Sequence, residues 1–201
     1  MMQSDLFPSP SSRLFDDATG FVEYLPDCID TDTAGHWFTQ LREAIDWRHE
    51  RRRMYERDVD VPRLVASFRL DDASLPLPLR DASDVAESRS GVRFNSVGLN
   101  FYRDGRDSVA PHNDHLDELE PGTPIVLLSL GDTRQMTIRA KRPPRRVLQL
   151  DLAPGSLLIM SYATQLHYDH GIPKVDYPVG PRISLAFRVR RKEGPAGGHY
   201  R

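Results

Sequence analysis

The chain has 201 residues, a net charge of −2 and 28% charged residues, which is typical of one globular domain with a sizeable core. No apolar run approaches the roughly 20 residues that a membrane-spanning helix needs. The mild acidity argues against a protein that coats nucleic acid through bulk positive charge. The single cysteine, Cys28, cannot form an internal disulfide. The chain does not open with a basic segment followed by an apolar one, so we expect no signal peptide and a cytoplasmic location.

The N-terminal part of the chain predicts a tail followed by a partly helical extension. Residues 1–17 are rich in Ser, Pro and Asp and predict a flexible tail. Residues 18–93 then predict a short strand at Phe21–Leu25, a helix at Asp32–Trp47, a Pro-rich loop at 75–79 and a short helix at 80–88. The run Arg51–Arg53 is typical of a solvated end of an element, and its alternative interpretation is an edge that contacts phosphates.

After Gly91 the sequence predicts strands. Six short β-rich segments are bounded by Gly, Pro or Asp: Phe94–Arg103, Ile125–Leu130, Gln135–Arg139, Arg146–Leu152, Ser156–Ser161 and Arg182–Arg190. Such strands after a helical start predict a mainly β domain over residues 94–190. We expect a double-stranded β-helix, or cupin-like jelly roll, with the N-terminal helices as a buttress. We expect Lys141–Arg146 to be a basic loop between strands and residues 191–201 to be a flexible tail.

The H-x-D motif at His112 and Asp114 suggests a metal site. On an extended segment both side chains leave the same face, which supplies two of the three ligands of a facial triad that holds Fe(II) and leaves positions open for a cosubstrate and O2. The motif alone is weak, because an exposed turn with a polar histidine has the same pattern. His167 and His170 compete to be the third ligand, and on a strand they would point to opposite faces.

Several motifs in the second half of the chain resemble the AlkB family of Fe(II)/2-oxoglutarate-dependent dioxygenases. In order they are F-N-S-V-G-L-N-F-Y-R-D-G at 94–105, H-N-D at 112–114, E-L-E-P-G-T-P-I at 118–125, P-G-S-L-L-I-M at 154–160, H-G-I-P at 170–173 and P-R-I-S-L-A-F-R at 181–188. The resemblance covers about residues 94–190 and, more faintly, 20–93. It implies the jelly-roll fold, with Fe(II), 2-oxoglutarate and O2 as cofactors.

The resemblance also implies roles for individual residues. The family's third ligand stands directly before x-[ILV]-Pro, which makes the metal ligands His112, Asp114 and His170. 2-Oxoglutarate has a carboxylate at each end, and a guanidinium grips a carboxylate with two parallel hydrogen bonds. Arg182 and Arg188 are six residues apart and face one side of a strand. Arg182 is implied to bind the distal carboxylate and Arg188 the end near the metal.

Three further residues are implied to bind the cosubstrate. Asn100 and Tyr102 lie two apart on one face and resemble the family's hydrogen-bond donors. Ser184 stands where the family has Asn, and its shorter hydroxyl offers a weaker hydrogen bond.

The residues predicted to contact the substrate depart most from the family pattern. The segment Val61–Phe68 is similar to the family's substrate lid but lacks its aromatic-aromatic-Gly ending. Within it, Arg63 and Phe68 are predicted to contact the substrate, although a phenylalanine here is equally typical of a core residue. Asp117 is predicted to replace the family's acidic residue that reaches the base.

The implied reaction is oxidative N-demethylation of alkylated bases in single- or double-stranded DNA, or in RNA, by a monomer. The target base would have to leave the stack or come from a single strand. The basic segments Arg51–Arg53 and Arg142–Arg146 favour this reading. The net acidity favours an alternative, the same oxygenase chemistry on a protein, lipid or small molecule. A third hypothesis is a jelly-roll binding module with a purely structural metal, against which the arginine pair argues.

Overall fold

The computed structural model describes residues 12–54 and 57–191, with the side chains of residues 50–60 left out. The strands within these residues are β1 Ser12–Asp17, β2 Gly20–Leu25, β3 Arg48–Met54, β4 Arg57–Arg69, β5 Ser96–Tyr102, β6 Val109–His112, β7 Ile125–Gly131, β8 Arg134–Ala140, β9 Val147–Leu152, β10 Leu157–Met160, β11 Tyr168–Ile172 and β12 Arg182–Arg188. The helices are α1 Thr31–Ala44, α2 Leu77–Ser90 and α3 Tyr162–His167, with a 3-10 turn, η1, at Leu116–Glu118. Each helix described here is too short or too polar to cross a lipid bilayer.

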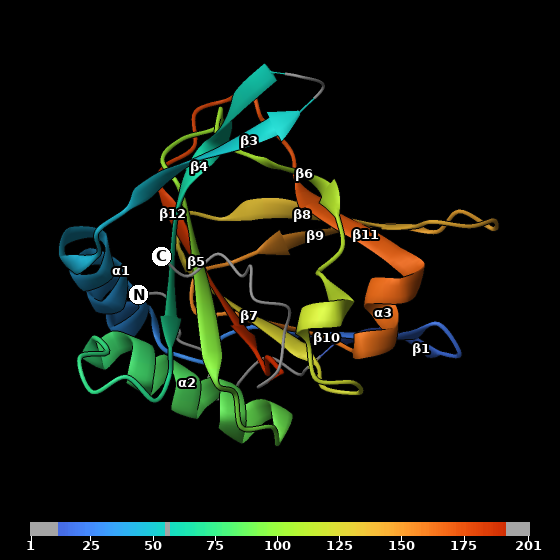
Figure 1. The fold of residues 1–201 in the computed structure, drawn as a ribbon, viewed down its shortest axis with the longest axis horizontal. Helices are drawn as coiled ribbons and strands as arrows, with labels where there is room; N and C mark the ends of the chain where they lie inside the picture. The colour runs from blue at the N-terminus through green and yellow to red at the C-terminus, as the bar shows by residue number, and fades with distance from the viewer. Residues whose placement is uncertain (1–11, 55–56, 192–201) are drawn as a thin grey trace, which may run out of the picture.

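The described strands form two antiparallel sheets (Figure 1). The larger has the order β1-β2-β10-β7-β12-β5-β4-β3, and the smaller has the order β6-β11-β8-β9. Residues from both sheets share one buried cluster, so the sheets pack face to face. This is the jelly roll that the sequence predicted, and α1 and α2 cover the outer face of the larger sheet as the predicted buttress.

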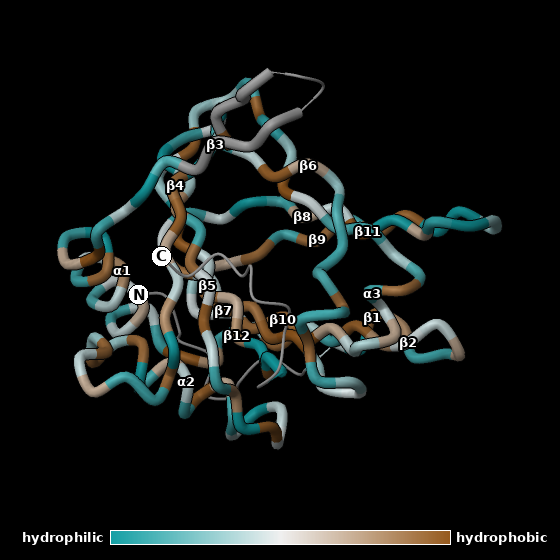
Figure 2. Tube along the Cα trace, in the orientation of Figure 1, coloured by the Kyte–Doolittle hydropathy of each residue, from teal (hydrophilic) through white to brown (hydrophobic). Residues whose placement is uncertain are grey.

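The strands carry many hydrophobic residues (Figure 2), and the buried ones divide into two cores. On β12, Ile183, Leu185 and Phe187 face α1 and α2, whereas Ala186 faces the smaller sheet. Because strand side chains alternate, Arg182, Ser184 and Arg188 share the inner face with Ala186. On β5, β10 and β12 the odd positions therefore face the helix-side core and the even positions face the space between the sheets, and on β7 this assignment is reversed.

Two predictions for the N-terminal part were wrong. Ser12–Asp17, placed in the tail, form β1, which pairs with β2. Phe15 anchors this strand by stacking on Tyr168 with ring centroids 4.8 Å apart, a long-range contact that local composition does not reveal. The extension over 18–93 is also less helical than expected, because β2, β3 and β4 widen the larger sheet. The predicted flexibility of residues 1–11 and 192–201 lies outside the described residues.

The helices begin earlier than the sequence predicted. Asp30 caps α1, which starts at Thr31, since its carboxylate accepts a hydrogen bond from the backbone N–H of Thr33. The helix α2 starts at Leu77 inside the expected Pro-rich loop, because proline is tolerated in the first turn of a helix. Short helix α3, which was not predicted, directly precedes β11.

Candidate metal and cosubstrate site

The side chains of His112, Asp114 and His170 meet between the sheets. His112 ends β6 and lies opposite His170 in the antiparallel pairing of β6 with β11. The two imidazole ring centroids are 4.5 Å apart, and one potential ligand atom from each of the three residues lies within 4.8 Å of the others. Two imidazoles and one carboxylate in this arrangement fit Fe(II) in a facial triad. We expected His112 and Asp114 to lie on one extended strand, but β6 ends at His112 and Asp114 lies just beyond it.

Charge and hydrogen bonding prepare these groups to bind a cation. The guanidinium of Arg188 donates to both carboxylate oxygens of Asp114, at 3.2 and 3.0 Å. Burial would raise the pKa of Asp114, but Arg188 and the two histidines outweigh it and lower this pKa to about 2. Burial lowers the pKa of His170 to about 3 and also lowers that of His112. At neutral pH the cluster therefore holds a carboxylate and two neutral imidazoles.

Neighbouring groups fix the orientation of two ligands. The Nδ1 of His112 lies 3.0 Å from the carbonyl oxygen of Ala110, which leaves Nε2 as the atom for a metal. The side-chain oxygen of Gln165, on α3, accepts a hydrogen bond from the backbone N–H of Asp114 at 3.1 Å. Sequence reasoning missed Gln165, because α3 has no motif that marks it.

The structure separates the competing histidines. His170 is buried in the cluster, whereas His167 is exposed at the end of α3. The carbonyl of His167 accepts a hydrogen bond from the backbone N–H of Lys141. His115, next to the H-x-D motif, is exposed as well. The geometry thus agrees with the ligand set that the resemblance implied.

A second part of the site surrounds Arg182, which is 1% exposed. Its Nη2 donates to the hydroxyl of Ser129 on β7 at 2.9 Å, and Tyr102 lies opposite it on β5. Its Nε and Nη1 are buried, and no residue within the described ranges accepts from them. Burial lowers the pKa of this guanidinium. An unpaired buried cation with free donors fits the distal carboxylate of 2-oxoglutarate.

The other residues predicted to bind the cosubstrate lie on the same inner surface. Ser184 is paired in register with Asn100 on one side and Ser129 on the other, which forms a polar row across three strands. The side-chain oxygen of Asn100 accepts a hydrogen bond from Nε of Arg63 at 2.6 Å. Ser129 was not predicted, because a serine within an apolar strand has no motif of its own.

The residues predicted to contact the substrate are placed differently from the prediction. Arg63 is 9% exposed and points inward, where it also donates to the carbonyl of Ser108. Phe68 packs against the helix-side core, on the face of β4 away from the metal cluster. The inward position of Arg63 and the helix-side position of Phe68 follow from the period of two along β4. Asp117 is exposed on η1. The side chains of Arg51–Arg53 lie outside the described residues.

Comparisons with known proteins agree with this arrangement. The model of the 2OG-Fe(II) oxygenase superfamily matches residues 73–188. Human "DNA oxidative demethylase ALKBH2" is 41% identical over 106 residues, which cover 49% of this chain and 41% of that protein. Bovine "Alpha-ketoglutarate-dependent dioxygenase alkB homolog 3" is 30% identical over 198 residues, which cover 87% of this chain and 68% of that protein.

A solved structure supports the fold. The structure of OsALKBH1 matches with a TM-score of 0.58 and 15% identity, over 90% of this chain and 100% of that chain. The match to human ALKBH2 spans only about two fifths of that relative's length. The family model covers more than half of the chain and corresponds to a family that uses Fe(II) and 2-oxoglutarate. The chain therefore belongs to the 2OG-Fe(II) oxygenase superfamily and, within it, to the AlkB family.

Proposed function

We propose that this protein uses Fe(II), 2-oxoglutarate and O2 to remove N-alkyl groups from nucleic-acid bases. The observation that carries this proposal is that the metal-ligand cluster lies between the same two sheets as Arg182, whose buried Nε and Nη1 lack a partner among the described residues. A structural metal needs no such anion site. The relatives named as DNA oxidative demethylases support a nucleic-acid substrate.

Different residues of the site would bind the metal and the cosubstrate. His112, Asp114 and His170 would hold Fe(II), and Arg188 keeps the carboxylate of Asp114 ionised and in place. Arg182 would bind the distal carboxylate of the cosubstrate. When bound, iron and 2-oxoglutarate supply the oxidation: O2 is consumed, succinate and CO2 leave, and a methyl group on nitrogen is lost as formaldehyde. The protein binds, orients and shields these reactants.

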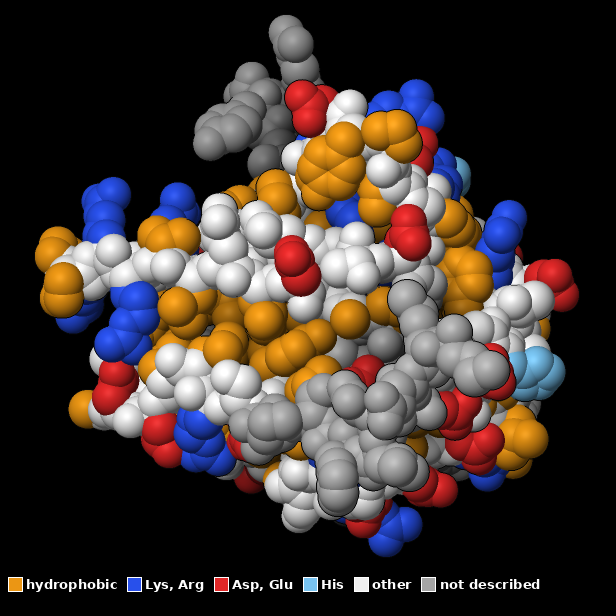
Figure 3. Space-filling model, turned by 180° about the vertical axis from the view of Figure 1, so that it is seen from behind, with side chains coloured by type: hydrophobic (Ala, Val, Ile, Leu, Met, Phe, Trp, Pro, Cys, Tyr) orange, Lys and Arg blue, Asp and Glu red, His pale blue; other side chains and the backbone are white. Residues whose placement is uncertain are grey.

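A basic surface next to the cluster supports contact with a phosphate backbone. The β8–β9 hairpin projects from the body and carries lysine and arginine side chains (Figure 3). Arg139, Lys141 and Arg145 line a hollow of about 210 Å³ at its base, together with Asp169. Nζ of Lys141 also donates to Asn113, the residue before Asp114, so the hollow adjoins the metal site. Neutralising phosphates with such groups gives a salt-dependent affinity.

The first experiment follows both products of the proposed reaction. Protein with Fe(II) and 2-oxoglutarate is incubated in air with a single-stranded oligonucleotide that carries one N1-methyladenine. Succinate and loss of the methyl group are measured by mass spectrometry. Because the base in a single strand is already accessible, this substrate avoids the free-energy cost of base flipping. We expect both products from the wild type.

Two matched variants control for the site. His170→Ala is expected to abolish both products, and His167→Ala, at an exposed histidine three residues earlier, is expected to retain them. Succinate without demethylation would move the proposal to the same chemistry on a protein, lipid or small molecule. Neither product, with iron shown to be bound, would overturn the enzymatic function and favour a binding module.

A further inference from the structure

Arg134 is a second buried arginine that the site described above does not use. It is 1% exposed and begins β8 on the smaller sheet, and its guanidinium lies near the same Tyr102 ring as that of Arg182. Its side chain shares the inner face of β8 with Met136 and Ile138, which belong to the core between the sheets. Burial of a charge without a paired anion costs free energy, so an arginine in this position suggests that a negatively charged group binds there.

The contacts of Arg134 leave its charge uncompensated. Its Nη atoms donate to three main-chain carbonyl oxygens, those of Asp104 at 3.0 Å, Asp107 at 2.9 Å and Pro173 at 2.7 Å. These acceptors are uncharged, and within residues 12–54 and 57–191 no carboxylate forms an ion pair with it. Its Nε is buried, and no described residue accepts from it. Arg134 thus has no charged partner among the described residues, and its Nε has no acceptor there.

Arg134 and Arg182 share one aromatic neighbour. The guanidinium carbon of Arg134 lies 5.6 Å from the ring centroid of Tyr102, and that of Arg182 lies 5.3 Å from the same centroid. After burial, the charge of Arg134 is among the causes that lower the pKa of Arg182. Two like charges around one buried ring repel each other in a medium of low dielectric. An anion between them would relieve this repulsion.

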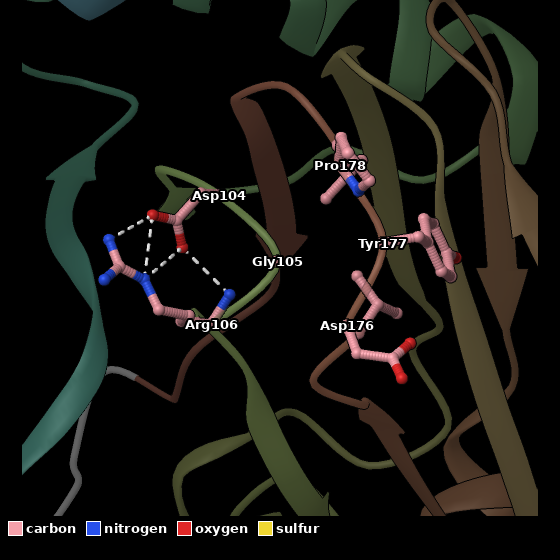
Figure 4. A pocket seen from close by; sticks show the side chains of 8 residues that line it. Asp104, Gly105, Arg106, Asp176, Tyr177 and Pro178 are labelled. Atoms are coloured by element: carbon pink, nitrogen blue, oxygen red, sulfur yellow. Dashed lines mark hydrogen bonds and ion pairs between the residues drawn. The ribbon is translucent and has the colours of Figure 1, made fainter.

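Hydrogen bonds to two surrounding loops hold the side chain of Arg134 in place. Through its three acceptors it joins the segment after β5 to the segment after β11. Figure 4 shows these two segments on either side of an open cleft. Asp104 and Arg106, which form an ion pair, line one wall, and residues 175–179 line the other. The backbone N–H of Val175 donates to the carbonyl of Gly105 at 2.9 Å. Arg134 therefore links these two segments next to the ring of Tyr102.

We propose that Arg134 is a specificity-determining residue that acts with Arg182 on the distal carboxylate of 2-oxoglutarate. Its charge makes the site select a dicarboxylate over a 2-oxo acid with a single carboxylate. The inference rests on 2-oxoglutarate as the cosubstrate but not on nucleic acid as the substrate. It predicts that the two arginines together, and not Arg182 alone, set the preference for the second negative charge.

The test compares two ligands of equal chain length. 2-Oxopentanoate has the carbon chain of 2-oxoglutarate without the distal carboxylate. Both are titrated calorimetrically into Mn(II)-loaded protein, without nucleic acid and without turnover. For Arg134→Gln we expect the Kd of 2-oxoglutarate to rise at least about tenfold. The variant loses a positive charge that attracts the distal carboxylate in a buried site of low dielectric. The Kd of 2-oxopentanoate should change less than about twofold.

Two further variants make the test decisive. Arg134→Lys keeps the charge but not the forked contacts, so it should retain most of the preference for 2-oxoglutarate. Arg106→Gln removes an exposed arginine on the β5–β6 loop, whose carbonyl groups bind Arg134, and should leave both affinities unchanged. If Arg134→Gln fails to fold, the test rests on Arg134→Lys. A folded Arg134→Lys protein that no longer prefers 2-oxoglutarate over 2-oxopentanoate would overturn the proposal.

The remaining outcomes are equally clear. Equal weakening of both acids in Arg134→Gln, or no change in either, would make Arg134 only a tie between loops and overturn the proposal. A wild type that binds neither acid would reject 2-oxoglutarate as the cosubstrate, and the role of Arg134 with it. These outcomes do not depend on whether nucleic acid is the substrate, because the titration contains no nucleic acid.

Discussion

Arg188 holds both carboxylate oxygens of Asp114, with Nε at 3.2 Å from one and Nη2 at 3.0 Å from the other. The two residues come from different sheets, since Arg188 ends β12 and Asp114 follows β6. This ion pair is largely buried, with side-chain exposures of 16% and 11%. The carboxylate therefore has a positive partner before any metal binds, and a metal would add a second one.

Loss of Arg188 should destabilise the metal-free protein more than the metal-loaded protein. In Arg188→Gln the carboxylate of Asp114 stays buried without its partner, which should cost roughly 3 kcal/mol of unfolding free energy in the presence of a chelator. Bound Mn(II) should restore part of this loss because it neutralises the same carboxylate. Urea unfolding with and without Mn(II) measures both values. Arg106→Gln, at an exposed pair, is the control, and an equal loss in both states would contradict the prediction.

The stability of the metal-free protein should fall as the pH is lowered from 7 to 4.5. Burial lowers the pKa of His170 from its ordinary 6.5 to about 3, so it is neutral when folded, whereas the unfolded chain takes up a proton below pH 6.5. The unfolded state then binds more protons, and stability is lost by up to about 1.4 kcal/mol per pH unit. His112 acts in the same direction. Asp114, with a pKa of about 2, contributes only below this window.

Replacement of His170 isolates its share of this pH dependence. Urea unfolding in chelator at pH 7, 6 and 5 should give a flatter profile for His170→Gln than for the wild type. His167→Gln should follow the wild type. Parallel profiles for all three proteins would contradict the assignment.

Phe68→Ala should reduce stability without affecting ligand affinity. Because Phe68 packs on the helix side of β4, its truncation should cost about 1–3 kcal/mol of unfolding free energy. The Kd values for 2-oxoglutarate and for a methylated oligonucleotide should stay at the wild-type level. A weaker oligonucleotide affinity at unchanged stability would restore the role in base stacking that the family resemblance suggested.

The basic hairpin should contribute to the salt dependence of oligonucleotide binding. Arg142 and Arg145 are exposed there, and their double change to Gln should reduce the slope of log K against log salt by roughly 1.4 for a single strand. Fluorescence anisotropy at several salt concentrations measures it. Arg42→Gln with Arg89→Gln changes the net charge equally, at the ends of α1 and α2, and should leave the slope unchanged.

The parts of the site that the sequence predicted are those with local periodicity. Arg182 and Arg188 share a face because of the strand period of two, which is visible in the sequence itself. Asp114 follows His112 closely enough for both to reach one ion. The jelly roll was predictable because each core strand is short and bounded by turn residues.

The parts that the sequence did not predict depend on long-range contacts. Arg134 follows a turn and would be expected on the surface, but carbonyl groups 30 and 39 residues away converge on it. Arg63 resembles a substrate residue until the pairing of β4 with β5 brings it to Asn100. Phe15 fixes β1 only because Tyr168 is there to receive it. No local pattern encodes these partners.

The alternation along β12 has a consequence for how this protein can evolve. Ile183, Leu185 and Phe187 serve only the helix-side core, so changes there alter stability while the chemistry of the opposite face stays intact. A single-residue deletion within β12 would exchange the two faces, send guanidinium groups into the helix layer and bring apolar side chains to the metal. Substitutions can thus adjust function and stability separately, whereas insertions and deletions in this strand would destroy both at once.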